Sequence, residues 1–84
     1  MEYYKMVIKG SCPYCVEAVS VLESQGVDFL YTDMQQCEYV LKEIQNDINH
    51  HTVPMVWKIS IDEDGNQTVR FIGGCDNLKE HFGV

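Results

Sequence analysis

Two cysteines three positions apart, Cys12 and Cys15, are the residues of this sequence best suited to covalent chemistry. Two thiols at this spacing can open and close a disulfide with little movement of the chain, which is the chemistry of a dithiol oxidoreductase. The same spacing can supply half of a zinc site, which needs a second Cys or His pair. The other two cysteines stand far apart and the paired histidines are adjacent, so we interpret the pair as redox-active.

The residues that follow Cys12 predict a helix. Apolar residues recur at helical spacing over residues 13–25, and Gly26 is a stop signal. Cys12 would then lie at a helix N-terminus, where unpaired backbone N–H groups and the positive end of the dipole favour a thiolate. Lys9 can add a positive charge nearby. We therefore predict that Cys12 attacks and that Cys15, inside the helix, resolves.

Four strands and two more helices are predicted from the rest of the chain. The strands are residues 3–8, 27–31, 55–61 and 68–72, and turn residues occupy 62–66. The order β-α-β-α-β-β-α makes the first two strands parallel and the last two antiparallel. It predicts one α/β domain over residues 1–84, with a four-stranded mixed sheet and three helices.

The second predicted helix has an apolar stripe, and the third is anchored by two apolar residues. The stripe comprises Cys37, Val40, Leu41, Ile44 and Ile48, and the anchors are Leu78 and Phe82. The stripe predicts that Cys37 is a buried core thiol, and we interpret the Cys75 side chain in the same way. The three histidines are expected to be solvated rather than to bind a metal.

The charge and the start of the chain restrict the possible partners and compartment. Six basic residues against thirteen acidic ones give a formal net charge of −7, which argues against nucleic acid and anionic membranes as partners. The N-terminus shows no basic region followed by an apolar segment and a cleavage site. We therefore expect a cytoplasmic protein whose thiols are kept reduced.

Three separated motifs together resemble one family, the glutaredoxins. They are residues 9–15 (KGSCPYC), residues 52–54 (TVP) and residues 73–77 (GGCDN), and the resemblance covers nearly the whole chain. It implies a thioredoxin-like fold, with a cis peptide bond before Pro54 and the Val53 backbone beside Cys12. It also implies a glutathione-dependent thiol–disulfide oxidoreductase in which Cys12 and Cys15 are catalytic.

The resemblance further implies how glutathione is held. Glutathione is expected as a co-substrate, with no tightly bound cofactor or metal, and Cys75 and Asp76 are expected to hold its γ-glutamyl end. The partners are then disulfide-bonded or glutathionylated proteins, with ribonucleotide reductase as one candidate, and the protein is expected to be a monomer. The implied glutathione-binding residues are Lys9, Tyr14, Thr52, Val53, Pro54, Gly74, Cys75 and Asp76.

Two departures from the family pattern concern the second half of the chain. Eighteen residues separate Pro54 from Gly73, so the hairpin is expected to be extended. Met55 and Asn77 stand where the family often has a polar or basic residue and an acidic one. These departures bear on glutathione affinity more than on the thiol chemistry.

Two alternative functions stay open from the sequence. One is a redoxin reduced by thioredoxin reductase instead of glutathione. The other is an iron–sulfur carrier, in which Cys12 from two subunits and two glutathiones supply four thiolates. Pro13 disfavours the carrier by analogy with the family, whose cluster-binding members commonly have a different loop.

Overall fold

The computed structural model describes residues 1–10 and 12–84, so Ser11 of the first motif lies outside it. The predicted order of strands and helices is confirmed. The elements are β1 (Glu2–Ile8), α1 (Pro13–Ser24), β2 (Phe29–Asp33), α2 (Glu38–Ile48), β3 (Met55–Ile61), β4 (Gln67–Gly73) and α3 (Cys75–Phe82). Within the described residues, no helix is both long enough and apolar enough to cross a membrane.

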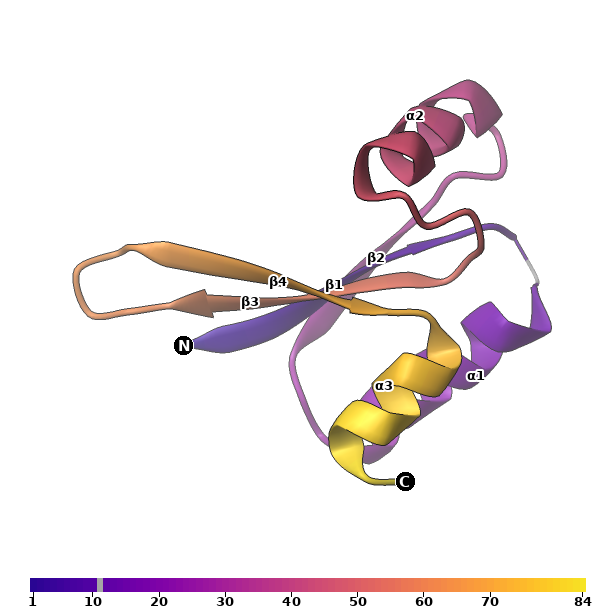
Figure 1. The fold of residues 1–84 in the computed structure, drawn as a ribbon. Helices are drawn as coiled ribbons and strands as arrows, with labels where there is room; N and C mark the ends of the chain where they lie inside the picture. Colours follow the sequence, from indigo (N-terminus) through magenta and orange to yellow (C-terminus); the bar gives the residue numbers. More distant parts are fainter. Residues whose placement is uncertain (11) are drawn as a thin grey trace.

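The four strands form one mixed sheet in the order β2-β1-β3-β4. β1 pairs with β2 in parallel, as the intervening helix requires, while β3 is antiparallel to both β1 and β4. Figure 1 shows α2 on one face of the sheet and α1 with α3 on the other. This is the thioredoxin-like fold that the sequence predicted.

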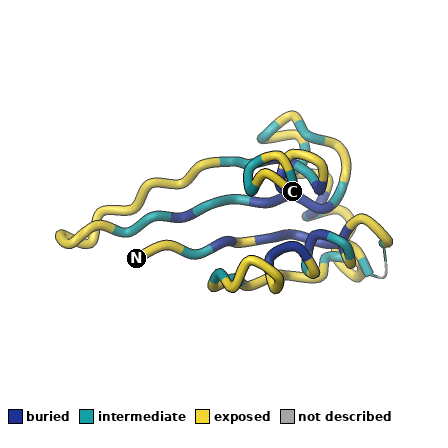
Figure 2. Tube along the Cα trace, turned by 90° about the horizontal axis from the view of Figure 1, so that it is seen from below, coloured by how far each residue is buried: buried dark blue, intermediate teal, exposed yellow. Residues whose placement is uncertain are grey.

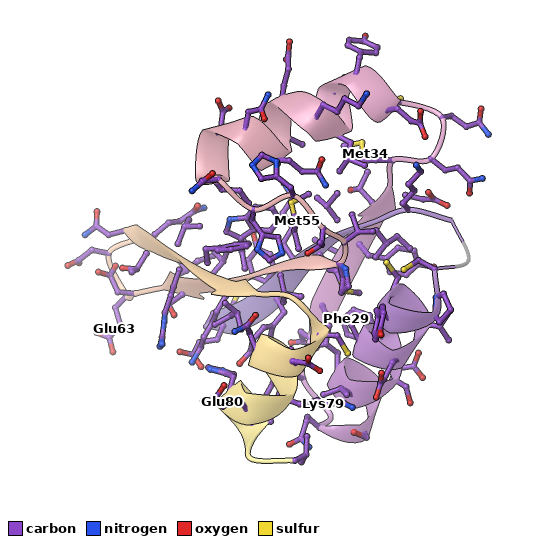
Figure 3. The ribbon with its side chains drawn as sticks, turned by 45° about the vertical axis from the view of Figure 1, so that its right-hand side comes forward. Phe29, Met34, Met55, Glu63, Lys79 and Glu80 are labelled. Atoms are coloured by element: carbon purple, nitrogen blue, oxygen red, sulfur yellow. The ribbon has the colours of Figure 1, made fainter. Side chains whose placement is uncertain are left out.

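Two apolar clusters hold these layers together, one on each face of the sheet. On the α1 and α3 face, Met6 and Leu22 are fully buried and Phe29 packs against their cluster. On the α2 face, Met55 is buried and Met34 packs against it, as Figure 3 shows between α2 and the sheet. The reactive motif is thus attached to an element that is fixed by buried apolar contacts.

The start of β2 and the position of Cys37 differ from the predictions. β2 begins two residues later than predicted and continues through Asp33, because backbone pairing with β1 extends to the pair Ile8 and Asp33. Cys37 is exposed and lies at the N-cap of α2, one residue before the helix, so its prediction as a core thiol was wrong. Of the apolar stripe, Leu41 is the residue that is buried.

The hairpin of β3 and β4 extends beyond the helices, as its length predicted. Figure 1 shows its tip far from all three helices, and Figure 2 shows buried positions concentrated away from that tip. The Asp62 carboxylate accepts hydrogen bonds from the N–H groups of Asp64 and Asn66, both at 2.9 Å. Gly65, with φ of 83°, completes the turn.

Candidate active site

Cys12 and Cys15 differ in their exposure although both belong to the start of α1. Cys12 is the N-cap residue, is partly exposed, and its carbonyl accepts hydrogen bonds from the N–H groups of Cys15 and Val16. Cys15 is 1% exposed and belongs to the core cluster. Pro13 at the first helical position suits this start, since its missing N–H costs no helical bond.

Backbone groups at the helix start favour the thiolate of Cys12. The N–H of Cys15 lowers the pKa of Cys12 most, and the Cys15 thiol and the N–H of Tyr14 lower it further, against an opposing effect of burial. Because the thiolate is the nucleophile, this lowered pKa makes Cys12 the attacking residue.

Burial has the opposite effect on Cys15. It raises the pKa of Cys15 to about 11, and the neighbouring Cys12 and Asp33 contribute in the same direction. The backbone N–H of Lys9 lowers it in part. A buried thiol beside a thiolate is arranged to react after Cys12 has formed a disulfide, which is the role of a resolving cysteine.

Contrary to the prediction, the charge of Lys9 is not among the groups that lower the pKa of Cys12. Its ammonium group pairs with the Glu38 carboxylate at 2.6 Å, and the groups that lower the pKa of Cys12 are Cys15 and Tyr14 instead. Lys9 thus binds the start of α2 rather than stabilising the thiolate.

A groove of about 240 Å³ brings together seven of the ten predicted site residues. The peptide bond between Val53 and Pro54 is cis, as the resemblance implied, and Tyr14 is 61% exposed at one side of the groove. Residues from three separate motifs therefore face one hollow. The seven are Tyr14, Thr52, Val53, Pro54, Gly74, Cys75 and Asp76.

A second hollow, of about 500 Å³, adjoins this groove through shared lining residues. Thr52 and Val53 line both, and Lys9 lines only the second. Gln45 and Lys42 of α2 border it as well. The predicted glutathione-binding residues therefore line two hollows that share Thr52 and Val53.

The start of α3 closes one end of the groove. Gly74 is the N-cap residue, and its N–H donates a hydrogen bond to the Asn77 side-chain oxygen at 3.0 Å. Asn77 thus supplies the acceptor that an acidic residue would supply. Gly73 has φ of 123°, and a Cβ there would lie 2.5 Å from the same Asn77 oxygen. The first backbone N–H groups of α3 have no partner within the helix, and Asp76 lies in its first turn.

The Cys75 side chain is buried, as predicted. Burial raises its pKa, and the nearby Glu17 carboxylate raises it further. Glu17 also pairs with Lys79, which links α1 to α3. The Cys75 thiol is therefore poorly suited to attack.

Sequence reasoning missed His50 as a lining residue of the groove. We expected it in a solvated loop, but it is half-buried and its Nε2 lies 3.1 Å from the Thr52 hydroxyl. Its ring packs edge-on against Phe71 at a centroid distance of 5.2 Å. Its closeness in sequence to Thr52 was the available signal. Over residues 1–10 and 12–84, no group of three or more His, Cys, Asp or Glu side chains is arranged to hold a metal ion.

The fold and the polarised thiol pair together define a thiol–disulfide oxidoreductase of the thioredoxin-like class. The sequence model of the glutaredoxin family matches residues 3–64. The chain therefore belongs to the glutaredoxin family.

Known relatives agree with this assignment. A curated glutaredoxin from Pseudomonas aeruginosa is 33% identical over 67 residues, covering 80% of this chain and 69% of the relative. The solution structure of a Brucella melitensis glutaredoxin has a TM-score of 0.68 and 26% identity, covering 95% of this chain and 79% of that one. The solution structure of the dithiolic glutaredoxin 2-C-Grx1 from Trypanosoma brucei brucei has a TM-score of 0.65 and 27% identity, covering 95% of this chain and 78% of that one.

Proposed function

We propose that this glutaredoxin uses glutathione to reduce glutathione mixed disulfides and protein disulfides. The observation that carries the proposal is the groove beside the thiol pair, because it combines the backbone of Val53, just before β3, with the N-terminus of α3. An extended peptide can pair with such a backbone, and a helix N-terminus suits a carboxylate. Glutathione is a short peptide with carboxylates at both ends.

The reaction follows from the two thiols. With a glutathionylated protein, the Cys12 thiolate attacks the glutathione sulfur, the protein thiolate leaves and takes a proton, and a Cys12–glutathione disulfide forms. A second glutathione thiolate attacks the glutathione sulfur of this disulfide, which releases oxidised glutathione and restores Cys12. With a protein disulfide, the Cys12 thiolate attacks one sulfur, the other sulfur leaves as a thiolate, and Cys12 forms a mixed disulfide with the protein. The Cys15 thiolate then attacks the Cys12 sulfur, which releases the second protein thiolate and leaves a Cys12–Cys15 disulfide. Two glutathione molecules reduce this disulfide and leave as oxidised glutathione.

Lys9 and Asp76 are proposed to contribute charge at the two ends of the bound tripeptide. Lys9 lines the larger hollow, and Asp76 lies at the start of α3 in the smaller one. Tyr14 offers an exposed ring beside the cysteines, and Thr52, Pro54, Gly74 and Cys75 complete the walls. The Cys75 contribution is through its backbone, because its thiol is buried.

Two serine substitutions test the proposed roles. Cys12→Ser is expected to abolish turnover of both a glutathionylated peptide and a protein disulfide, because no other thiol is both accessible and activated at the site. Cys15→Ser is expected to retain deglutathionylation and to lose most reduction of the protein disulfide. Turnover by the Cys12→Ser protein in either assay would contradict the assignment.

A second measurement distinguishes the reducing partner. Turnover coupled to glutathione and glutathione reductase is expected, and turnover coupled to thioredoxin reductase alone is not. Ribonucleotide reductase is proposed as one protein-disulfide substrate. We further propose a monomer of one domain that acts in the cytoplasm, where reduced glutathione is available to restore Cys12.

A further inference from the structure

The half of the sheet nearest the hairpin tip has an apolar groove on the face that carries α2. The groove has a volume of about 420 Å³ and we call it the distal groove. Tyr3, Ile59 and Val69 lie directly opposite one another across β1, β3 and β4, and Trp57 occupies the next row. Val69 is 59% exposed. Figure 1 shows that α2 covers the other half of this face and does not reach the tip of the hairpin.

The opposite face of the same strands is polar. Alternate residues of a strand point to opposite faces, so Lys58 and Ser60 share the face away from the distal groove. The Glu2 carboxylate lies 3.3 Å from the Lys58 ammonium and accepts a hydrogen bond from the Ser60 hydroxyl. Apart from the buried Tyr4, this part of the face therefore carries polar and charged side chains, whereas the lining of the distal groove is mostly apolar.

Carboxylates lie close in sequence to lining residues of the distal groove, both on α2 and in the hairpin turn. Ile44 of α2 lines the groove, and Asp47 is the i+3 neighbour of Ile44 on the helix surface. Glu43 precedes Asp47 by four residues, so these two carboxylates lie on one side of α2. The hairpin turn adds further carboxylates at the far end, at positions 62–64. Lys5 is the charged residue of the lining, and its flexible stem lets the ammonium group reach water.

We propose that the distal groove binds a cationic amphipathic helix of a partner protein. The apolar side of the helix would cover Trp57 and Val69, and its basic residues would face the carboxylates of α2 and of the turn. A second copy of this chain fits less well, because each copy has a net charge of −7 and would bring the same carboxylates together. The tip of the β3–β4 hairpin lies at the opposite end of the sheet from the start of α1 (Figure 1), so the distal groove and the reactive cysteines could be occupied at once.

Trp57 provides a direct test because it is the only tryptophan in the chain. The probe is a helical peptide of about 18 residues, roughly 27 Å long, built from leucine on one face and lysine on the other. A matched peptide carries glutamate in place of lysine. The lysine peptide is expected to give a saturable 1:1 blue shift of Trp57 emission that weakens at high salt, and the glutamate peptide is expected to give none.

Substitutions around the groove locate the binding. Val69→Gln and the double change Glu43→Gln with Asp47→Asn are each expected to weaken binding roughly fivefold, about 1 kcal/mol. Thr68→Gln is the matched control, because Thr68 is an exposed neighbour on the same strand that points to the polar face. It is expected to leave binding unchanged, and circular dichroism checks that each variant is folded.

Three results would overturn the proposal. The first is unchanged Trp57 emission with the lysine peptide, and the second is equal binding of the glutamate peptide. The third is a wild-type dimer in sedimentation that Val69→Gln converts to a monomer, which would assign the face to a second copy. Since none of these measurements depends on Cys12, the docking proposal and the proposed redox function fail independently.

Discussion

The thiol pair of this glutaredoxin is polarised by ordinary features of a helix start rather than by a neighbouring cation. Cys12 has free backbone N–H groups in front of it, and Cys15 is enclosed by the core. In the sequence, a lysine close to the two cysteines suggests that its positive charge stabilises the thiolate. Here the Lys9 ammonium is paired with Glu38 and is not among the groups that lower the pKa of Cys12.

This polarisation predicts a clear difference in alkylation by iodoacetamide. Only the thiolate reacts, so the rate at Cys12 should rise with pH through a midpoint below the usual thiol value, because its pKa is lowered. With a pKa of about 11, only about one Cys15 side chain in a thousand is a thiolate at pH 8. Peptide mapping by mass spectrometry of the Cys37→Ser protein, which lacks the exposed thiol, should therefore show selective modification of Cys12 at pH 8.

The Lys9→Gln substitution tests the source of the lowered pKa. Because backbone groups and Cys15 lower the pKa of Cys12, the midpoint pH of its alkylation should not change when the Lys9 charge is removed. Stability should change by less than about 1 kcal/mol, since the pair with Glu38 is exposed. An alkylation midpoint that rises by one pH unit or more would show that the Lys9 charge does activate Cys12.

At the scale of elements, the join between β4 and α3 depends on Gly73. A Cβ at this position meets the Asn77 side chain, and φ of 123° is unfavourable for any other residue. Gly73→Ala should therefore lower the free energy of unfolding by about 2 kcal/mol or more. Gly65→Ala is the matched control, because Gly65 also has a positive φ but a Cβ there meets nothing within 4 Å.

Urea denaturation of the two variants provides the measurement. Gly65→Ala should cost about 1 kcal/mol, the price of the left-handed backbone alone. Equal losses for the two variants would show that the Asn77 contact has no effect. A larger loss for Gly73→Ala should come with weaker glutathione binding, since the displaced Asn77 caps the start of α3.

The sequence predicted the elements of the fold more completely than their ends. The helix after Cys12 and the hairpin strands were recognisable because apolar spacing and turn residues are local signals. β2 was misplaced by two residues because Thr32 and Asp33 are polar, and only their pairing with β1 makes them strand. Cys37 was misassigned because it continues the apolar spacing of α2 but precedes its first turn.

The candidate site could be predicted only in part for a similar reason. Local spacing identified the two cysteines, whereas the meeting of Tyr14, Val53 and Asp76 depends on the packing of three distant segments. The family resemblance supplied that information. It did not indicate that His50 lines the groove, because the contacts of His50 with Thr52 and Phe71 depend on how the loop packs against β4.

At the scale of the whole molecule, Tyr4 and His81 connect the sheet to the C-terminal helix. The Tyr4 hydroxyl lies 2.9 Å from His81 Nε2. Burial lowers the pKa of His81, and the nearby Lys58 and Arg70 lower it further, while Glu2 opposes them. The neutral form is therefore favoured in the folded protein. This contribution to stability is fully present above about pH 6.5 and is lost as the pH falls through the lowered pKa.

Chemical denaturation at a series of pH values tests this coupling. The free energy of unfolding should decrease as the pH falls below about 6.5, because the unfolded chain takes up a proton at His81 before the folded one does. His81→Gln keeps a hydrogen-bonding group near Tyr4 but cannot titrate, so its profile should be flatter in this window. His51→Gln, at an exposed position, should retain the wild-type slope. Identical slopes for all three proteins would exclude His81 as the cause.

The extended hairpin separates two regions of the molecule that can be changed independently. Ile61 and Gln67 pair directly, so replacing residues 62–66 with Asn-Gly should form a two-residue type I′ turn that keeps the register. The free energy of unfolding should change by about 1 kcal/mol or less, because two effects oppose each other. The shorter loop has a smaller entropic cost of closure, whereas the hydrogen bonds of the Asp62 side chain are lost. Deglutathionylation should keep its kcat/KM, since the reactive cysteines lie at the far end of the sheet (Figure 1).

The same variant should bind the leucine-lysine peptide more weakly, because it lacks the carboxylates of Asp62, Glu63 and Asp64 while Trp57 and Val69 remain. A folded variant that lost turnover would show that the hairpin contributes to the thiol chemistry. A variant that kept both turnover and full peptide affinity would show that the carboxylates of α2, and not those of the turn, attract the lysine side chains of the peptide. The two assays thus assign the effect of the hairpin to one end of the molecule or the other.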